Sequence, residues 1–303
     1  MIQYLQHQDI DKAKWDVCIE QAVNTLIYAS SWYLDAVSPE WEALVLDDYV
    51  AVMPLTKGRK YFLSYLYQPF FTQQLGVFSK LEIRQEILRD FIEAIPKKYR
   101  FIEIQLNEQN HLLDERYKVK RTKNYLLNLN KSYEKLYKDF NDQARRNLKK
   151  AKKQELEIKT IPYDDVIHFY KLHKGIVTKG VKETDYNKFR NLMEEAWQRK
   201  KLISRGVYNK TNELLAAGLF LSHRNRIVFI LGTASEPGRD SGAMHFLFDH
   251  LIFQFADHKM ILDFEGSEIP GIARFFKSFG AEKFHYYRLK MNRLPWFIKL
   301  LKP

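Results

Sequence analysis

Three carboxylates near the end of the sequence are the residues best placed for acid–base chemistry. Asp263, Glu265 and Glu268 lie within residues 261–268, at the end of an apolar run that predicts a buried strand. Ligands commonly bind at such strand ends in open α/β sheets, and a carboxylate there can deprotonate an amine or hold an ammonium group. Alternate residues of a strand share a face, so we expect Asp263 and Glu265 to point the same way. Helix capping by Ser267 and Glu268, with surface salt bridges, is the alternative interpretation.

A strand, a turn and the start of a helix form a second segment of interest. Residues 226–234 predict the strand, residues 235–242 the turn, and residues 243–256 a strongly apolar helix. The free backbone N–H groups of a helix start can bind a phosphate or a carboxylate. A plain loop followed by a capped helix is the alternative. The residues predicted to hold the phosphate of a donor are Thr233, Arg239, Ser241, Gly242 and Ala243.

Residues 145–153 contain six cations and no acidic residue to offset them. In a helix, Leu148 and Ala151 would turn inward and the cations would cover most of the exposed surface. Such a surface can bind tRNA or an anionic lipid headgroup; a solvated face that only aids solubility is the alternative. A sequence-specific DNA-binding protein is not expected, because no recognition-helix or zinc-finger pattern accompanies the charge. The six cations are Arg145, Arg146, Lys149, Lys150, Lys152 and Lys153.

Other motifs in the sequence are incomplete. Gly175–Gly180 has the spacing of a phosphate-binding loop, but Val181 and Lys182 follow where Lys and Ser or Thr are required, which excludes a P-loop NTPase. His245 and Asp249 are four residues apart in a predicted helix, a spacing that suits a metal ion. No third ligand accompanies them, so no metal is expected. No GxSxG motif marks a serine nucleophile.

The composition predicts a globular protein of two domains or one large one. The 303 residues are 46% hydrophobic and 15% aromatic, which excludes a disordered or fibrous chain. Basic residues exceed acidic ones by 49 − 37 = 12, which favours anionic partners. The lone Cys18 cannot form an internal disulfide, the first residues lack a secretion signal, and no uninterrupted apolar stretch approaches ~18 residues. We therefore expect a soluble, cytoplasmic protein.

The elements that must position these groups alternate between strands and helices. Residues 41–46 and 49–55 predict a hairpin at a sheet edge, and Ser132 is expected to cap one long amphipathic helix that ends near Gln154. The order strand, helix, strand occurs in both halves, as a duplicated fold would require. The other predicted helices cover residues 80–94, 163–174, 185–201 and 269–279, and the other predicted strands cover 101–106, 203–208, 213–222 and 259–264.

Three parts of the chain share their pattern with one family. Residues 262–267, Leu-Asp-Phe-Glu-Gly-Ser, and residues 271–281 form a closing strand and helix. The basic run 145–153 precedes a strand-like segment at 156–158, and residues 68–76 read Gln-Pro-Phe-Phe-Thr-Gln-Gln-Leu-Gly. Together these segments resemble Fem-type acyltransferases of the GNAT superfamily, from the first domain to the last helix.

The resemblance implies an α/β (α+β) protein of two tandem GNAT-like domains, each a mixed, mostly antiparallel sheet flanked by helices. It places a degenerate N-terminal domain at residues 1–130 and a donor-binding domain, opened by the basic linking helix, at residues 131–303. It further implies transfer of an acyl or aminoacyl group to an amine, with acyl-CoA (acetyl-CoA) or aminoacyl-tRNA as donor and no metal. The acceptor would be a small molecule, a peptide or a cell-envelope precursor.

Two departures from the family pattern matter for the site. Residues 239–243, Arg-Asp-Ser-Gly-Ala, only approximate the pyrophosphate loop of GNAT enzymes. Phe276 stands where a polar residue is expected on the last helix, and Lys277 follows one residue later, which turns its side chain by about 100°. Other candidates for the general acid are a bound water, Tyr286, Tyr287 and His285.

The leading hypothesis is an N-acyltransferase in which Glu265 removes the ammonium proton, with Asp263 as the reserve base. The acceptor contacts predicted are Gln68, Phe71 and Lys277. The second hypothesis is a non-catalytic GNAT-like module that binds tRNA or an anionic envelope precursor. Residues 294–303 combine aromatics with lysine, which suits either contact with the inner membrane surface or packing across the two domains.

Overall fold

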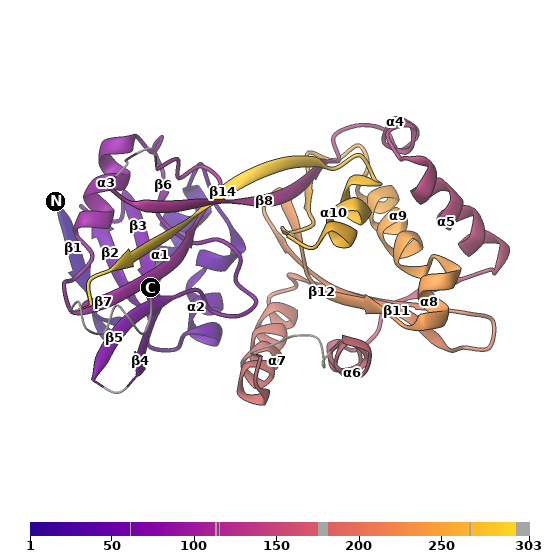
Figure 1. The fold of residues 1–303 in the computed structure, drawn as a ribbon, viewed down its shortest axis with the longest axis horizontal. Helices are drawn as coiled ribbons and strands as arrows, with labels where there is room; N and C mark the ends of the chain where they lie inside the picture. Colours follow the sequence, from indigo (N-terminus) through magenta and orange to yellow (C-terminus); the bar gives the residue numbers. More distant parts are fainter. Residues whose placement is uncertain (61, 113, 115, 175–180, 267, 295–303) are drawn as a thin grey trace. The chain divides into compact units, whose positions relative to one another are not determined.

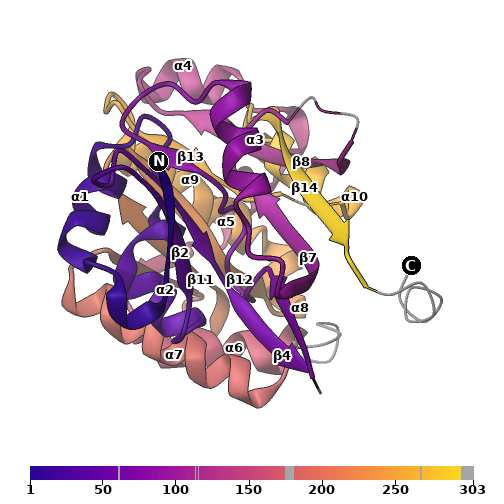
Figure 2. The same ribbon diagram turned by 90° about the vertical axis from the view of Figure 1, so that its left-hand side faces the viewer.

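The computed structural model describes residues 1–60, 62–112, 114, 116–174, 181–266 and 268–294. These residues form two compact units, which can be followed in Figures 1 and 2. Unit 1 contains residues 1–122 and 285–294, and unit 2 contains residues 123–284. The predicted second domain ran from residue 131 to the end of the chain. The structure instead returns the chain to unit 1 at His285, because the last strand pairs with a strand of that unit.

Unit 1 contains two sets of paired strands. The first has the order β1-β2-β3-β6, and in the second β4, β5, β7 and the last strand, β14, follow one another. Two 3₁₀ turns, His7–Asp9 and Ile27–Ala29, flank the first helix. The strands are β1 (Ile2–Leu5), β2 (Glu42–Leu46), β3 (Ala51–Leu55), β4 (Lys57–Lys60), β5 (Leu63–Tyr67), β6 (Phe78–Ser79), β7 (Tyr99–Leu106) and β14 (Glu282–Asn292); the helices are α1 (Lys12–Gln21), α2 (Ser31–Val37) and α3 (Gln85–Glu93).

The predicted hairpin of unit 1 is present as β2 and β3, with Leu46 paired to Ala51 across the turn. It is not at the edge of the sheet, because β1 and β6 flank it on either side. The burial of nearly every residue of both strands agrees with this interior position. After β5, the chain crosses through α3 and returns as β7 in the parallel direction. This crossover gives unit 1 the strand-helix-strand arrangement expected of one GNAT-like half.

Unit 2 is built on a sheet with the order β8-β13-β12-β11-β10-β9. All neighbouring strands are antiparallel except β12 and β13. The strands are β8 (Lys118–Asn128), β9 (Glu157–Lys159), β10 (Leu202–Tyr208), β11 (Leu214–His223), β12 (Arg226–Ala234) and β13 (Ile261–Asp263). The helices are α4 (Tyr133–Lys138), α5 (Asp142–Lys153), α6 (Tyr163–Lys174), α7 (Glu183–Gln198), α8 (Glu236–Ser241), α9 (Ala243–Phe255) and α10 (Pro270–Lys277).

Helices cover both faces of the unit 2 sheet. Figure 1 shows α9 and α10 on one face and α6 and α7 on the other. The first face carries a core of buried aromatic side chains from the sheet, α9 and α10, among them Phe220, Phe248, Phe264 and Phe276. Each fully buried side chain of this size contributes on the order of 2 kcal/mol through the apolar surface it removes from water. The predicted α/β class, with mixed and mostly antiparallel sheets flanked by helices, is confirmed.

The predicted helix from Ser132 to Gln154 is instead two helices, α4 and α5. The chain breaks at Asp139–Asn141, where Asn141 caps α5 by accepting a hydrogen bond from the Ala144 N–H at 3.0 Å (N···Oδ1). A side-chain cap of this kind starts a new helix more favourably than continued helix through Asn. Within the described residues, no helix combines the length and apolar character needed to cross a bilayer.

Candidate active site

The parallel strands β12 and β13 stay together for only three residues. Residues 226–228 pair with residues 261–263. Beyond this point the chain keeps to β8, because the Phe264 N–H donates to the Tyr125 carbonyl oxygen at 3.0 Å (N···O), while β12 continues to Ala234. The two strands therefore part at their carboxyl ends, which is the position where open α/β sheets commonly bind ligands.

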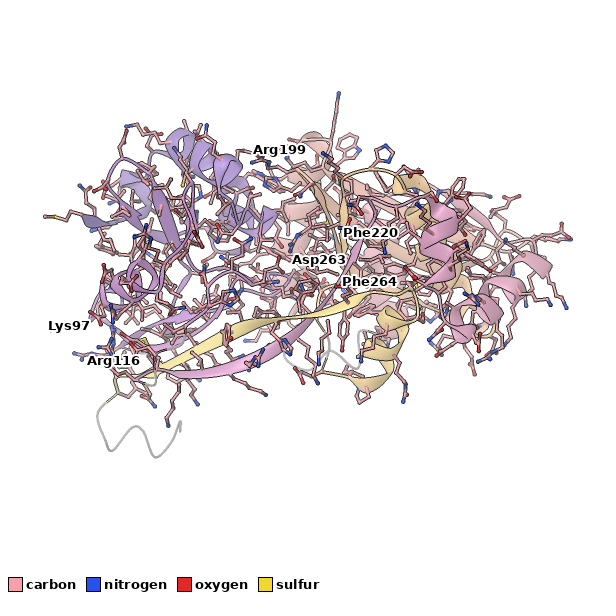
Figure 3. All side chains as sticks on the ribbon, turned by 90° about the horizontal axis from the view of Figure 1, so that it is seen from above. Lys97, Arg116, Arg199, Phe220, Asp263 and Phe264 are labelled. Carbon is pink, nitrogen blue, oxygen red and sulfur yellow. The ribbon has the colours of Figure 1, made fainter. Side chains whose placement is uncertain are left out.

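Asp263 lies at the parting point and is held in an ion pair. Its side chain is fully buried, and its Oδ2 accepts from Arg226 Nη1 at 2.9 Å. Its Oδ1 accepts from the backbone N–H of Glu265 at 2.9 Å (N···Oδ1). Figure 3 labels Asp263 and Phe264 within unit 2. A carboxylate engaged at both oxygens, one of them with a guanidinium, is suited to holding the end of β13 in place.

Glu265 does not continue the alternation of the strand. The strand ends at Asp263, and Glu265 has a left-handed backbone with φ of 58°. The expected common direction of Asp263 and Glu265 depended on extended backbone between them, so that argument does not apply. Glu265 is half-buried, whereas Glu268 is exposed and pairs with Lys123 at 3.6 Å (Oε2···Nζ). Of the three predicted carboxylates, Glu265 is the half-buried one, between the fully buried Asp263 and the exposed Glu268.

Lys277 lines a cation-rich cavity of about 370 Å³ in unit 2. Four cations and one carboxylate, Glu268, line this cavity, so its charge favours an anionic ligand. The Lys277 Nζ lies 5.9 Å from the ring centroid of Tyr125, over its face. Sequence reasoning identified Lys277 and Glu268 in separate arguments and missed the other cations, which are far apart in the chain. The four cations are Lys123, Arg274, Lys277 and Lys283.

Phe276 is a core residue of α10. It is 4% exposed and its ring packs against Phe264 and Tyr125, with centroids 5.0 and 6.0 Å away. One helical step separates it from Lys277, and that rotation directs Phe276 into the core and Lys277 to the cavity. The three other residues predicted as candidates for the general acid, His285, Tyr286 and Tyr287, lie on β14, and Tyr286 is buried.

The predicted phosphate cradle is closed in the structure. The predicted turn is the short helix α8, capped by Ser235, and α9 starts directly after it at Ala243. Ser241 and Ala243 are buried, and a Cβ on Gly242 would lie 2.6 Å from the carbonyl oxygen of Asn147 in α5. The start of α9 therefore faces a carbonyl oxygen of α5, which carries partial negative charge and disfavours a phosphate.

Thr233 and Arg239, the two remaining residues predicted to bind the phosphate, come before and after Ser235 in the sequence. Arg239 is exposed, and its Nη1 donates to the Ala234 carbonyl oxygen at 2.9 Å. Thr233 is 4% exposed, and its Oγ1 has no hydrogen-bond partner among the described residues. Pairing with Ala217 places Thr233 on the face of the sheet that α6 covers. The five predicted residues are therefore adjacent in sequence without forming one open site.

The basic helix α5 has the inward and outward faces that its sequence predicts. Ala144, Leu148 and Ala151 are buried against the core, and all six cations of residues 145–153 are exposed. None of these six forms a salt bridge with any residue that the structure describes. Arg145 is engaged only locally, through a hydrogen bond from Nη2 to the Lys138 carbonyl oxygen at 2.9 Å and a contact with the Tyr137 ring. The helix thus presents concentrated, uncompensated positive charge.

In unit 1, Gln68 braces the loop of residues 68–76. Its Oε1 accepts from the Gln105 N–H at 2.9 Å (N···O), and its Nε2 donates to the Thr72 carbonyl oxygen at 3.0 Å. Phe71 has φ of 61°, and its carbonyl oxygen accepts from the Tyr33 hydroxyl. Gln68 also lines a cavity of about 260 Å³, together with Glu103, which pairs with Arg288 at 3.6 Å.

A cluster of three buried asparagines fixes the same loop, and sequence reasoning missed it. Asn24, Asn107 and Asn110 each donate a side-chain hydrogen bond to the Val77 carbonyl oxygen, with N···O distances of 2.8 to 3.0 Å. The side chain of Asn110 also fills the space beside Gly76, whose φ is 94°. The spacing of 24, 107 and 110 in the sequence gives no local signal of this convergence.

His245 and Asp249 occupy separate environments. His245 packs between Phe275 and Phe279, and burial lowers its pKa to about 4. Asp249 accepts from the Tyr133 hydroxyl at 2.7 Å. Across the described part of the chain, no group of three or more His, Cys, Asp or Glu side chains is placed to hold a metal. The predicted loop at Gly175–Gly180 and residues 295–303 of the tail lie outside the described residues.

Each unit contains one crossover between parallel strands, and β12 and β13 separate at their carboxyl ends. These features define the class of fold as a tandem GNAT-like protein. No family model and no curated protein sequence matches the chain. Among solved structures, FemX is 13% identical, with 99% of each chain covered and a TM-score of 0.71. L-PGS from Bacillus licheniformis is 9% identical over 96% of this chain and 95% of its own, with a TM-score of 0.55.

A tandem GNAT protein from the clavulanic acid biosynthesis pathway is 10% identical, covers 97% of this chain and 99% of its own, and has a TM-score of 0.55. At identities this low, the structural similarity establishes a common fold and nothing further. The chain therefore has the fold of Fem-like tandem GNAT proteins over nearly its whole length, as the resemblance of its sequence segments implied.

Proposed function

We propose that this protein is a Fem-like acyltransferase that moves an aminoacyl group from aminoacyl-tRNA to the amine of an anionic acceptor. The observation that carries the proposal is helix α5, which presents six cations without acidic partners among the described residues. The same helix packs against Gly242, so that the space at the start of α9 is filled. A row of fixed cations suits a phosphodiester backbone, whose binding is dominated by such charges. The fold shared with FemX supports an acyltransferase of this type.

Acyl-CoA is the less favoured donor because α5 fills the space at the start of α9, where its pyrophosphate would bind. A CoA pyrophosphate needs open space at the helix start, and Gly242, the residue before α9, packs closely against the Asn147 backbone of α5. Helix α8 has six residues and begins against β11, where the Ser235 N–H donates to the Leu215 carbonyl oxygen at 2.9 Å (N···O). Neither helix offers the open anion site that the sequence predicted.

The proposed chemistry uses Glu265 and Lys277. Glu265 accepts the proton of the acceptor ammonium, directly or through water, and the free amine attacks the ester carbonyl carbon. A C–N bond forms, the bond to the ribose oxygen of the tRNA breaks, and that oxygen takes up a proton. The cations around Lys277 hold the anionic part of the acceptor, and Lys277 stabilises the negative charge that develops on the carbonyl oxygen.

Binding of tRNA at several salt concentrations tests the donor. Replacing Arg146 and Lys150 with Gln should lower the slope of log K against log salt by about 1.5, because each lost phosphate contact removes ~0.7–0.9. The matched control replaces two exposed cations outside α5, Lys97 and Lys259, which should leave the slope unchanged. Saturable acetyl-CoA binding without tRNA binding would contradict the proposal.

The non-catalytic module is the second candidate function. It is favoured by Asp263, a site carboxylate engaged in an ion pair, and by Phe276, which is buried where a polar residue was expected. A protein that binds tRNA tightly at high salt but gives no transfer to any amine, including free amino acids and peptides, would favour this candidate.

A further inference from the structure

A cavity of about 610 Å³ lies in unit 2 between the start of α6, the end of α7 and β10. Its volume is within the ~300–1,000 Å³ typical of small-molecule sites. It shares no lining residue with the cation-rich cavity around Lys277. The cavity lies beside a strand edge, because β9 pairs with residues 206–208 of β10 only. Residues 202–205 pair with β11 on one side and have no strand partner among the described residues on the other.

Two side chains at this edge lack the partner that their burial requires. Ser204 is 6% exposed, and its Oγ has no hydrogen-bond partner among the described residues. Arg205 is half-buried; its Nη1 donates to Thr160 Oγ1 and to the Ser204 carbonyl oxygen, each at 3.0 Å. No carboxylate of the described residues pairs with Arg205, and burial lowers its pKa. A half-buried guanidinium without a carboxylate partner is an arrangement that a carboxylate ligand satisfies.

The other walls of the cavity supply a carboxylate and an apolar surface. Glu194 accepts from the Tyr163 hydroxyl at 2.7 Å, a hydrogen bond that lowers the pKa of Glu194 and keeps it ionised. Trp197, 62% exposed, and Leu202 line the opening and provide apolar contact. The cavity therefore combines a site for an anion, a site for a cation and a surface for a hydrocarbon group.

We propose that this cavity binds a free α-amino acid with an apolar side chain. The carboxylate of the amino acid pairs with the guanidinium of Arg205, and its ammonium group faces Glu194. The side chain of the amino acid packs on Trp197 and Leu202. This site is separate from the one assigned to transfer and does not depend on the proposed function.

Calorimetric titration of the full-length protein with L-phenylalanine and L-leucine tests the site. We expect saturable binding with Kd of ~1 mM or tighter. Phenylalanine amide and N-acetylphenylalanine each lack one charge and should bind at least about tenfold more weakly. Arg205→Met should weaken L-phenylalanine binding by about tenfold or more. The matched control is Arg84→Met, at an exposed arginine of unit 1.

Binding that requires both charged groups of the ligand and is weakened by Arg205→Met but not by Arg84→Met supports the proposal. Absence of saturable binding by both amino acids overturns it, as does equal binding of phenylalanine amide. Because the ligand analogues are measured on the unaltered protein, the outcome does not depend on whether a variant folds.

Discussion

Substitution of Asp263 by Asn separates a structural role from a catalytic one. The change keeps the size of the side chain but removes its charge, so the contact with Arg226, whose side chain is only 11% exposed, is no longer an ion pair. Removing one partner of a buried ion pair costs about 3–5 kcal/mol, since the remaining charge stays desolvated. For a unit of this size each kcal/mol lowers Tm by about 2–4 °C, so we expect a decrease of about 10 °C.

The assay is thermal and urea unfolding followed by circular dichroism, with transfer measured well below the transition. Asp263→Asn combined with Arg226→Met should recover most of the stability, because both charges of the buried pair are then removed. Asp240→Asn, at an exposed position in α8, is the matched control and should change stability by less than about 0.5 kcal/mol. A variant Asp263→Asn that unfolds at the temperature of the unaltered protein yet has lost transfer would refute the structural role.

Three further predictions follow from single contacts. Burial acts to raise the pKa of Glu42, but hydrogen bonds from two tyrosines and two lysines lower it to about 2. The ionised Glu42 therefore contributes about 3 kcal/mol to the free energy of unfolding above pH ~4.5, and this contribution is lost as pH falls towards 2. Glu42→Gln should make the stability depend less on pH over that range. His245, whose pKa burial lowers to about 4, stabilises the fold above pH ~6.5 and loses that contribution as pH falls towards 4, so His245→Gln should flatten the stability profile over that interval. Gly242→Ala should destabilise by at least about 1 kcal/mol, because φ is 77° and its Cβ would meet Asn147, whereas Gly271→Ala, with nothing within 4 Å, should be neutral or stabilising in chemical denaturation.

Much of the fold could be predicted because its signals are local. Local periodicity, a cap or a turn marks the hairpin of residues 42–55, the basic amphipathic helix, and α10, which ends at Lys277 shortly before Gly280. The break between α4 and α5 was missed, because the apolar spacing continues through residues 139–141 and the Asn141 cap decides the outcome. The prediction that the hairpin lies at a sheet edge was wrong. Its interior position depends on β1 and β6, which are distant in sequence.

The candidate site was predictable in its residue types and less so in its geometry. Asp263 and Glu265 were found at the end of the correct strand, but the left-handed backbone at Glu265 gives no signal in the residue type. The predicted phosphate site has the expected order of strand, turn and helix. The space beside Gly242 is filled by the backbone of Asn147, about 95 residues earlier in the chain, which no local pattern indicates. The cations that join Lys277 come from separate elements, so only the packed structure brings them together.

Single-turnover transfer with the two donors side by side tests the central claim most directly. The protein would be mixed with labelled aminoacyl-tRNA or labelled acetyl-CoA and a panel of anionic amines, and label on the amine would be measured for the unaltered protein, Glu265→Gln and Arg146→Gln/Lys150→Gln. We predict transfer from aminoacyl-tRNA only, slowed strongly by Glu265→Gln and weakened at high salt by the double variant in α5. Transfer from acetyl-CoA that neither change affects would contradict the account.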